Sequence, residues 1–395
     1  MAHSFVAFPG QVEPSPKRGR LSRVHQLTIL FIGLAIWYGP ALAKEPCSAP
    51  LKVCTARDAV FRISSFNPYG SAVRIGPNLL VTSRHLVVDE QLAKLHMPDG
   101  SKIDARVLAS SYEGDLVLLE AQLPQGPVLP LVDGHVGGDL YTVGYDLSKR
   151  GIQVYPPGRL IIEPAPKRPF ARLHHTAHTQ PGNSGGALVD DTGRLVGIAA
   201  SGGEGRFEAI PATEIAKLRA NSGELYEKRG RLIGQAYRAC MELLEQARPP
   251  HTRVKTTVLE ELASACKNTG NRQLIDLTAQ TLGRNGDVAG SIVFFEKALD
   301  RDPHAINSRL GLVVSLHMVR AYEQEREHLR FLMSAIPGDP MVHRYAVQVG
   351  KFTGDDRLTK DALKLIEAHN PRALPAAKRF LESKSQPQKQ TPRKQ

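Results

Sequence analysis

The 395-residue sequence is poor in several features that would point to particular classes of protein. It has four cysteines and no Cys-x-x-Cys pair, so the ligand spacing of common zinc sites is missing. Lys and Arg outnumber Asp and Glu by 51 to 39, yet no basic block alternates with aromatic residues, which argues against a dedicated nucleic-acid surface. We interpret the net charge of +12 as a solubility feature or as weak affinity for anionic surfaces, and we predict no metal or cofactor.

Residues 1–43 have the pattern of an export signal. A basic region precedes an apolar run, which is shorter than the roughly 20 residues of a membrane-spanning helix and is followed by a small-x-small cleavage site. These three parts are Lys17 to Arg23, Leu27 to Gly39 and Ala41 to Ala43. The sequence therefore predicts a signal peptide and a periplasmic or secreted protein. The alternative is an uncleaved membrane anchor over residues 24–43.

All four cysteines follow this segment, as expected for an exported protein with disulfide bonds. Three pairings are possible. We favour Cys47 with Cys54 and Cys240 with Cys266, because each pair is local and closes a small loop or clamps a helical hairpin. A catalytic cysteine is not expected, because none of the four lies in a turn that would present a nucleophile.

The length predicts two or three domains, each able to bury its own core. Residues 56–216 contain twelve short candidate strands separated by Gly, Pro and Asp turns, which is typical of an all-β fold. From about Thr213 the apolar residues take a helical period instead. We expect an all-β domain at 44–222, an all-α domain at 223–382 and a disordered basic tail at 383–395.

A serine lies between glycines in the stretch Gln180-Pro181-Gly182-Asn183-Ser184-Gly185-Gly186. A tight, exposed turn of this composition can present the Ser184 hydroxyl. It can also direct the backbone N–H groups of Gly182 and Ser184 at one point, as in an oxyanion hole. A serine hydroxyl is a weak nucleophile without a base, and the motif alone is equally consistent with a plain glycine-rich turn.

Two upstream stretches favour the catalytic interpretation. The apolar run that begins at Leu79 ends at His85, and Asp115 opens a second apolar run. Taken alone, each residue is more often a core, surface or turn residue. Together they arrive in the order His, Asp, Ser, each beside a strand and a turn. The pattern predicts His85 as general base, Asp115 as the group that orients it and Ser184 as nucleophile.

These blocks resemble the trypsin-like serine proteases, and in particular their HtrA/Deg branch, where Asn-Ser-Gly-Gly replaces Asp-Ser-Gly-Gly. The blocks are Gly70 to Val73 with Val81 to His85, Gly114 to Leu119, and Pro181 to Leu188, and Phe207 to Pro211 resembles the closing strand. The resemblance covers about residues 56–216. It implies two six-stranded β-barrels with the active site between them, and cleavage of protein or peptide substrates through an acyl-enzyme.

The resemblance places the substrate pocket at His178, Thr179, Ala200 and Ser201. His178 stands six residues before Ser184, where trypsin has an aspartate, so a preference for Lys or Arg is not expected. A small or aliphatic preference is implied, and an acidic one is the alternative because His and Thr side chains can accept a carboxylate. The histidines His174, His175 and His178 do not have metal-ligand spacing.

The sequence departs from the family at both ends. It has no Ile-Val-Gly-Gly start whose freed amine could activate the site, and no obvious PDZ domain follows residue 216. The helical part resembles tetratricopeptide (TPR) repeats instead. Residues at the signature positions are Ala279, Leu282, Ser291, Phe295, Ala298 and Pro303. Pro371 lies two 34-residue periods after Pro303, and the copy between them is marked either by Pro337 or, with an insertion, by Pro340.

Stacked helix pairs bury a shared core and leave a concave face for a protein partner. The sequence therefore predicts an exported serine endopeptidase whose helical domain recruits substrates or a partner. One alternative is that the helices only stabilise the protease. Another is a binding or scaffold protein with a weak or inactive protease fold. A nucleic-acid-binding role rests on charge alone and is the weakest interpretation.

Overall fold

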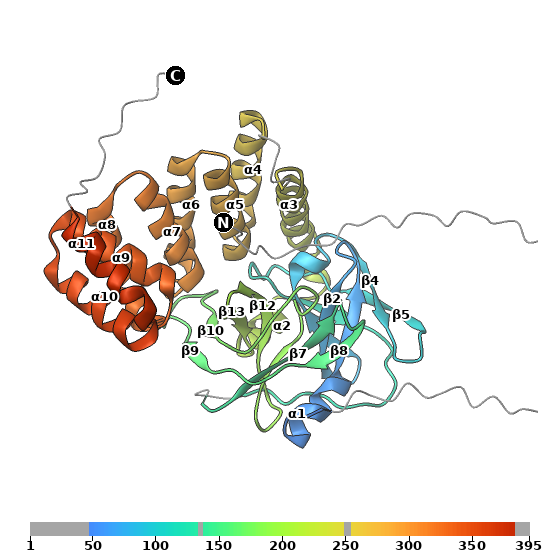
Figure 1. Ribbon diagram of the computed structural model, residues 1–395. Coiled ribbons are helices and arrows are strands. Elements are labelled where there is room, and N and C mark those ends of the chain that lie inside the picture. Colours follow the sequence, from blue (N-terminus) through green and yellow to red (C-terminus); the bar gives the residue numbers. More distant parts are fainter. Residues whose placement is uncertain (1–46, 133–136, 249–253, 384–395) are drawn as a thin grey trace, which may run out of the picture.

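The computed structural model describes residues 47–132, 137–248 and 254–383 (Figure 1). The predicted signal peptide and the part of the predicted tail after Ser383 lie outside these described residues. Across the described ranges, no helix combines the length and the apolar character that crossing a membrane requires.

The first six strands close into a barrel in the order β1-β2-β3-β6-β5-β4. Their bounds are β1 Val60–Ser64, β2 Gly70–Gly76, β3 Leu79–Thr82, β4 Leu92–His96, β5 Lys102–Val107 and β6 Val117–Glu120. The interior is filled by apolar side chains such as Ile63, Leu80, Leu95 and Leu119, all fully buried. Closure leaves no free strand edge in this unit. A short helix, α1 (Leu51–Ala56), precedes the barrel.

The second β unit is a seven-stranded sheet with the order β8-β7-β11-β12-β13-β10-β9, where the sequence predicts a second six-stranded barrel. Its strands are β7 Leu140–Asp146, β8 Gly151–Val154, β9 Leu160–Ile162, β10 Leu173–His175, β11 Ala187–Asp190, β12 Leu195–Gly203 and β13 Arg206–Pro211. The difference arises at the two edge strands. Pro156 and Pro157, between β8 and β9, cannot donate ladder hydrogen bonds. Ile161 and Ile162 of β9 pack against the helices.

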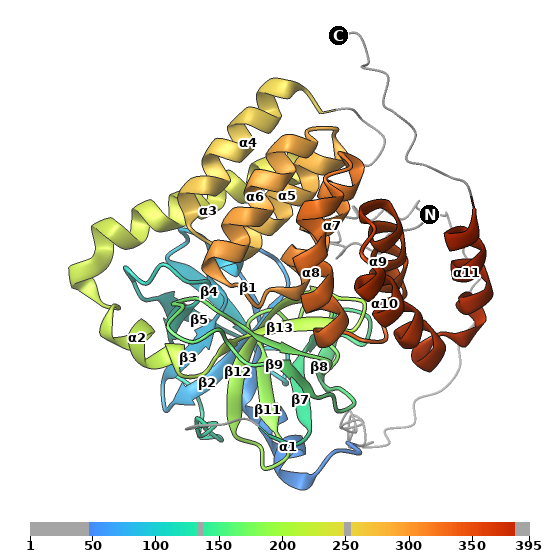
Figure 2. The same cartoon turned by 90° about the vertical axis from the view of Figure 1, so that its left-hand side faces the viewer.

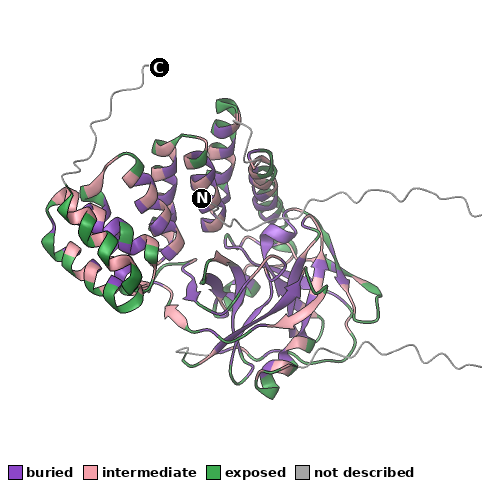
Figure 3. Ribbon diagram, in the orientation of Figure 1, coloured by how far each residue is buried: buried purple, intermediate pink, exposed green. Residues whose placement is uncertain are grey.

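Helices follow from residue 214 to residue 382, and those from residue 227 onward lie along one side of the β units (Figures 1 and 2). Their bounds are α2 Glu214–Ala220, α3 Glu227–Gln246, α4 Thr256–Thr269, α5 Arg272–Arg284, α6 Val288–Arg301, α7 Ile306–Met318, α8 Tyr322–Ala335, α9 Pro340–Thr353, α10 Asp356–His369 and α11 Leu374–Glu382. Side chains of Asn271, Asp287, Asp339 and Asp355 cap α5, α6, α9 and α10 by accepting backbone N–H groups. Buried residues gather inside the β units and on the facing sides of the helices (Figure 3).

The helices repeat with a regular spacing. Helices α5, α7, α9 and α11 begin at 34-residue intervals, and α6, α8 and α10 do the same. Pro303, Pro337 and Pro371 each lie three residues before α7, α9 and α11. Pro337 therefore marks the intermediate copy, and no insertion before Pro340 is needed.

Both predicted disulfide bonds are present. Cys47 is bonded to Cys54 at the start of the described chain, and Cys240 of α3 is bonded to Cys266 of α4. The second bond joins two helices that are consecutive in the sequence but are separated by residues outside the described ranges.

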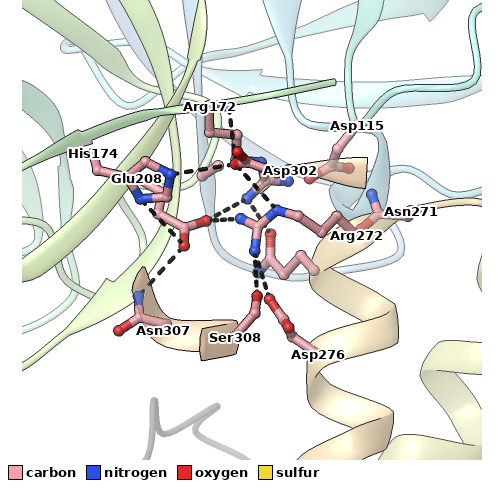
Figure 4. A network of polar contacts seen from close by, with 12 residues as sticks. Asp115, Arg172, His174, Glu208, Asn271, Arg272, Asp276, Asp302, Asn307 and Ser308 are labelled. Atoms are coloured by element: carbon pink, nitrogen blue, oxygen red, sulfur yellow. Dashed lines mark hydrogen bonds and ion pairs between the residues drawn. The ribbon is translucent and has the colours of Figure 1, made fainter. Parts of the chain in front are cut away.

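A buried charge network joins the helices to the second sheet (Figure 4). Glu208 of β13 accepts hydrogen bonds from Arg172, at 3.2 Å, and from Arg272 of α5. His174 of β10 pairs with Asp302 through Nε2, also at 3.2 Å. These side chains are almost wholly inaccessible to solvent. Because an unpaired charge is costly away from water, each of them depends on partners from the other part of the chain.

Replacing Glu208 should therefore destabilise the protein strongly. We expect Glu208→Gln to lower the free energy of unfolding by about 3–5 kcal/mol, because the arginine charges stay buried without their carboxylate. Glu204→Gln is the matched control, since Glu204 is exposed and pairs with Arg206 at the surface. It should cost about 0–1 kcal/mol. Urea unfolding followed by circular dichroism measures both, and equal midpoints for the two variants would refute the prediction.

Candidate active site

The structure brings His85 and Asp115 into direct contact. A single 3₁₀ turn, Arg84–Leu86, follows β3 and carries His85, while Asp115 lies two residues before the start of β6. The backbone N–H of His85 donates to Oδ1 of Asp115 at 3.0 Å, and the imidazole Nδ1 lies 2.7 Å from Oδ2. Only 4% of His85 and 3% of Asp115 is exposed. A proton on Nδ1 leaves Nε2 as the basic nitrogen.

The charge of Asp115 is balanced within the fold. Burial alone raises the pKa of this carboxyl, but the hydrogen bonds and charge of His85, together with the charge of Arg172, hold its pKa below the ordinary value. Asp115 is therefore ionised at neutral pH and can stabilise an imidazolium on His85. The buried guanidinium of Arg84 donates to the carbonyls of Ser110 and Tyr112 at 3.3 and 3.4 Å, which ties together the segments on either side of the pair.

Ser184 lies in a turn that Asn183 holds from inside. Asn183 is fully buried, and its Oδ1 accepts the backbone N–H of Gln180 at 2.8 Å. Its Nδ2 donates to the carbonyl of Tyr145 at 3.0 Å and to the hydroxyl of Tyr155 at 3.2 Å. The N–H of Asn183 closes the turn by donating to the Gln180 carbonyl at 2.9 Å. The turn is thus fixed without a freed terminal amine.

The first barrel holds the same turn from the other side. Ser71 of β2 donates through Oγ to the carbonyl of Gly182 at 2.7 Å, and through its N–H to the carbonyl of Ser184 at 2.9 Å. Gly182 has a φ of +97°, and a Cβ there would lie 2.6 Å from the Tyr145 carbonyl, so only glycine fits. Among the described residues, the N–H groups of Gly182 and Ser184 have no hydrogen-bond partner. Two free donors beside the serine are what an oxyanion hole requires.

The Ser184 hydroxyl is not yet directed at His85. Its Oγ donates to the carbonyl of Ala200 on β12 at 3.2 Å, and within the described part of the chain no hydrogen bond joins it to the imidazole. Catalytic hydrogen bonds often form only when substrate is present. Ala200 is buried, so its backbone carbonyl and not its side chain contributes here, and Ser201 follows it on the same strand.

The other residues predicted for the pocket have different surroundings. His178 is exposed, and its ring lies between Tyr155 and Phe207, with centroid distances of 5.3 and 5.5 Å. Thr179 is buried, and its hydroxyl lies 3.2 Å from that of Thr142. Of the two polar side chains considered for an acidic substrate, only His178 is therefore open to solvent.

The three histidines of this segment do not meet at one point. His174 belongs to the charge network, 3.2 Å from Asp302 and 3.8 Å from Glu208. His175 is fully buried, and neither of its ring nitrogens has a hydrogen-bond partner of good geometry among the described residues. Within the described ranges, no group of three or more His, Cys, Asp or Glu side chains is placed so that it could hold a metal ion.

The sequence motifs did not identify the groups that position the site. Ser71 lies in the block Gly70 to Val73, which resembles the protease family, but the motif does not predict that Ser71 holds the turn. Tyr155 and Arg172 belong to segments without a motif, and their partners Asn183, Asp115 and Glu208 lie elsewhere in the chain. No local pattern could have indicated these contacts, because each depends on how the strands are arranged.

Residues 70–198 match the family model described as "Trypsin-like peptidase domain". The serine endoprotease DegS of Escherichia coli (strain K12) is 29% identical over 127 residues, which is 30% of this chain and 35% of DegS. The periplasmic serine endoprotease DegP of the same strain is 30% identical over 186 residues, which is 42% of this chain and 38% of DegP. The solved HtrA-type protease AlgW with tripeptide is 27% identical, with a TM-score of 0.38, and the match covers 43% of this chain and 61% of AlgW.

The chain therefore contains a trypsin-like peptidase domain. The curated relatives of this domain include the serine endoproteases DegS and DegP. The chain spans little more than a third of the length of these two curated relatives.

The buried His175 should make stability depend on acidity. Burial, with the charge of His174, lowers the pKa of His175 from 6.5 to about 3, against smaller opposing effects of Glu208 and the Ala177 backbone. The fold favours the neutral ring. The contribution of His175 to the free energy of unfolding is therefore fully present above pH 6.5. It is lost as the pH falls towards 3, by up to about 1.4 kcal/mol per pH unit.

The variant His175→Leu takes up no proton, and it should lose stability less steeply than the wild type between pH 6 and pH 4. At pH 7 the two should differ by less than about 1.5 kcal/mol, because the side chains have similar volumes. Urea unfolding at several pH values measures the slopes. Parallel curves for the two proteins would show that His175 does not titrate in this way.

Proposed function

We propose that this chain is a serine endopeptidase that hydrolyses peptide bonds in protein substrates. In this proposal Ser184 is the nucleophile, His85 the general base and Asp115 the group that orients the imidazole and neutralises its charge. The observation that supports it is the double contact of Asp115 with His85, through the backbone N–H at 3.0 Å and through Nδ1 at 2.7 Å. This contact sets both the position and the tautomer of the base.

The reaction begins with a rotation of the Ser184 side chain away from the Ala200 carbonyl and towards Nε2 of His85. The hydroxyl then attacks the substrate carbonyl while His85 takes its proton. The N–H groups of Gly182 and Ser184 stabilise the oxyanion, an effect typically worth about 10²–10³ in rate for each donor. His85 next protonates the leaving amine, and water releases the acyl group with the same base.

Export is part of the proposal. Two disulfide bonds are typical of an oxidising compartment outside the cytosol, and both bonds lie beyond the segment with the signal-peptide pattern. We infer that the mature protein acts in the periplasm or outside the cell.

We further propose that the helical region is a TPR-like array that recruits substrates or a protein partner. The support is the 34-residue spacing of its helices, which is the period of that repeat. A cleft of about 670 Å³ between α8 and α10 offers a binding surface. Its lining includes the charged side chains of Arg330, Arg357, Asp361 and Lys364 beside Met333 and Leu365.

The catalytic assignment predicts the loss of activity in three variants. Ser184→Ala and His85→Ala should lower kcat by about 10⁴-fold or more, and Asp115→Asn by about 10⁴-fold because it favours the wrong tautomer. A fluorophosphonate probe and an unfolded protein substrate measure labelling and cleavage. Ser101→Ala, in an exposed turn between β4 and β5, is the control and should behave as the wild type. A wild type that neither labels nor cleaves would instead favour a binding protein with an inactive protease fold.

The recruiting role predicts a difference between substrates. Arg357 and Lys364 are exposed on α10, with side chains 87% and 66% accessible. The double variant Arg357→Ala, Lys364→Ala should raise KM several-fold for an unfolded protein. For a short peptide that reaches only the catalytic site, KM should stay unchanged. Steady-state kinetics with both substrates separates the cases, and equal KM values for the two enzymes on the protein substrate would contradict recruitment through this cleft.

A further inference from the structure

Helix α3 lies against both segments that carry the catalytic pair, and two glycines permit the approach. A Cβ at Gly234 would lie 2.6 Å from the carbonyl oxygen of Val88 and 2.8 Å from the Cα of Asp89. A Cβ at Gly230 would lie 2.8 Å from the backbone nitrogen of Ser110. These neighbours are backbone atoms and cannot move aside as a flexible side chain can. Helix α3 therefore contacts the chain three residues after His85 and five residues before Asp115.

The two glycines lie one turn apart on the same face of α3, and other contacts hold that face in place. Arg238 forms ion pairs of 2.6 Å with both Asp89 and Glu90. Ile233 and Tyr237 share an apolar cluster with Val88. Val88 has a φ of +49°, which is unfavourable for a β-branched residue and persists only where the surroundings impose it. The backbone after His85 is thus shaped by the helix.

Tyr237 links the same face of α3 to α5. Its side chain is fully buried, and its hydroxyl accepts a hydrogen bond from Nδ2 of Asn271 at 2.8 Å. Burial raises the pKa of Tyr237, and the charge of Asp115 raises it further, so the phenol stays neutral at physiological pH. Figure 4 draws Asp115 with Asn271 and Arg272 around one network.

The position of α3 is in turn set by the other helices. The disulfide bond between Cys240 and Cys266 fastens it to α4. The hydrogen bond from Asn271, the N-cap residue of α5, fastens it to the repeat array. A displacement of α4 or α5 would therefore move α3, and with it the segments that carry His85 and Asp115.

We propose that α3 is an intramolecular positioning element for the catalytic pair, with Gly230, Gly234 and Tyr237 as positioning residues. The inference rests on the proposed serine endopeptidase function. It gives the helical region a role in turnover itself, in addition to any role in recruiting substrates. A misplacement of a catalytic group by about 1 Å can cost about 10²-fold in rate, so a small shift of α3 would be enough to matter.

The variant Gly234→Ala tests the proposal, because a merely helical role and a positioning role predict opposite effects of this substitution. In a helix interior, Gly→Ala normally stabilises by about 1 kcal/mol. If the close contact had no consequence, Gly234→Ala would be neutral or more stable and fully active. The proposal predicts the opposite, a kcat about 10- to 100-fold lower per titrated active site, with KM unchanged. Gln235→Ala, at the adjacent exposed position, is the matched control and should keep the wild-type kcat.

The experiment uses the full mature chain and two readouts. The first is kcat per active site titrated with a fluorophosphonate, which a loss of folded molecules alone would not change. The second is backbone hydrogen exchange of residues 84–89, measured in a Ser184→Ala background so that it does not depend on activity. We expect exchange there to be at least 10-fold faster with Gly234→Ala and unchanged with Gln235→Ala. If wild-type protein shows no labelling, the protease proposal fails, and the exchange data still decide whether α3 fixes this segment.

Tyr237→Phe provides a second variant in case Gly234→Ala does not fold. It keeps the packing of the ring and removes only the hydroxyl that binds Asn271. We expect a several-fold lower kcat with an unchanged KM, and faster exchange in the same segment. Wild-type kcat per titrated site together with wild-type exchange, in either variant that folds, would overturn the proposal and leave α3 a purely stabilising helix.

Discussion

The carboxylate of Asp115 is the charge on which the site depends. It is buried, so its charge must be balanced by neighbours, and the pair it forms with His85 provides most of that balance. Arg172 adds to it from the second sheet. Because Arg172 also pairs with Glu208, and Glu208 with Arg272 of α5, the electrostatic compensation continues into the helical region. The arginine whose charge helps to lower the pKa of Asp115 thus also takes part in the contact between the β units and the helices.

The turn that carries Ser184 is held in a different way, by neutral hydrogen bonds from both β units. Ser71 of the first barrel binds the carbonyls of Gly182 and Ser184, while Asn183 binds the second sheet through Tyr145. This arrangement fixes the backbone of the turn without using the Ser184 hydroxyl, which instead donates to the Ala200 carbonyl. His85 is thus fixed by a charged partner and the turn by backbone geometry. In the proposed mechanism, Ser184 exchanges its hydrogen bond to the Ala200 carbonyl for one to His85.

The local parts of this design could be predicted from sequence. Each disulfide bond joins cysteines that are close in sequence, so short patterns identified both bonds. His85, Asp115 and Ser184 each stand beside a strand and a turn, so short patterns could indicate them as candidates, and the structure brings His85 and Asp115 into contact. The helical period was visible through Pro303 and Pro371. The Arg172–Glu208–Arg272 network could not be predicted, because its members are 36 and 64 residues apart and follow no period. The second sheet differs from the expected barrel for a related reason: helices cover β9, and nothing within the strand itself reveals that contact.

A glycine in a helix interior destabilises the helix by about 1 kcal/mol relative to alanine, so the two glycines on one face of α3 must be offset by another interaction. The offset is the close approach of the helix to the backbone at Val88 and Ser110, which a larger residue would prevent. The first part of the helical region, from α3 to α5, therefore packs against the β units. Helices α8 and α10 instead form a cleft of their own with charged side chains. The two roles that we propose for the helical region, holding the segments of His85 and Asp115 and binding a partner, therefore fall on two surfaces that share no residue.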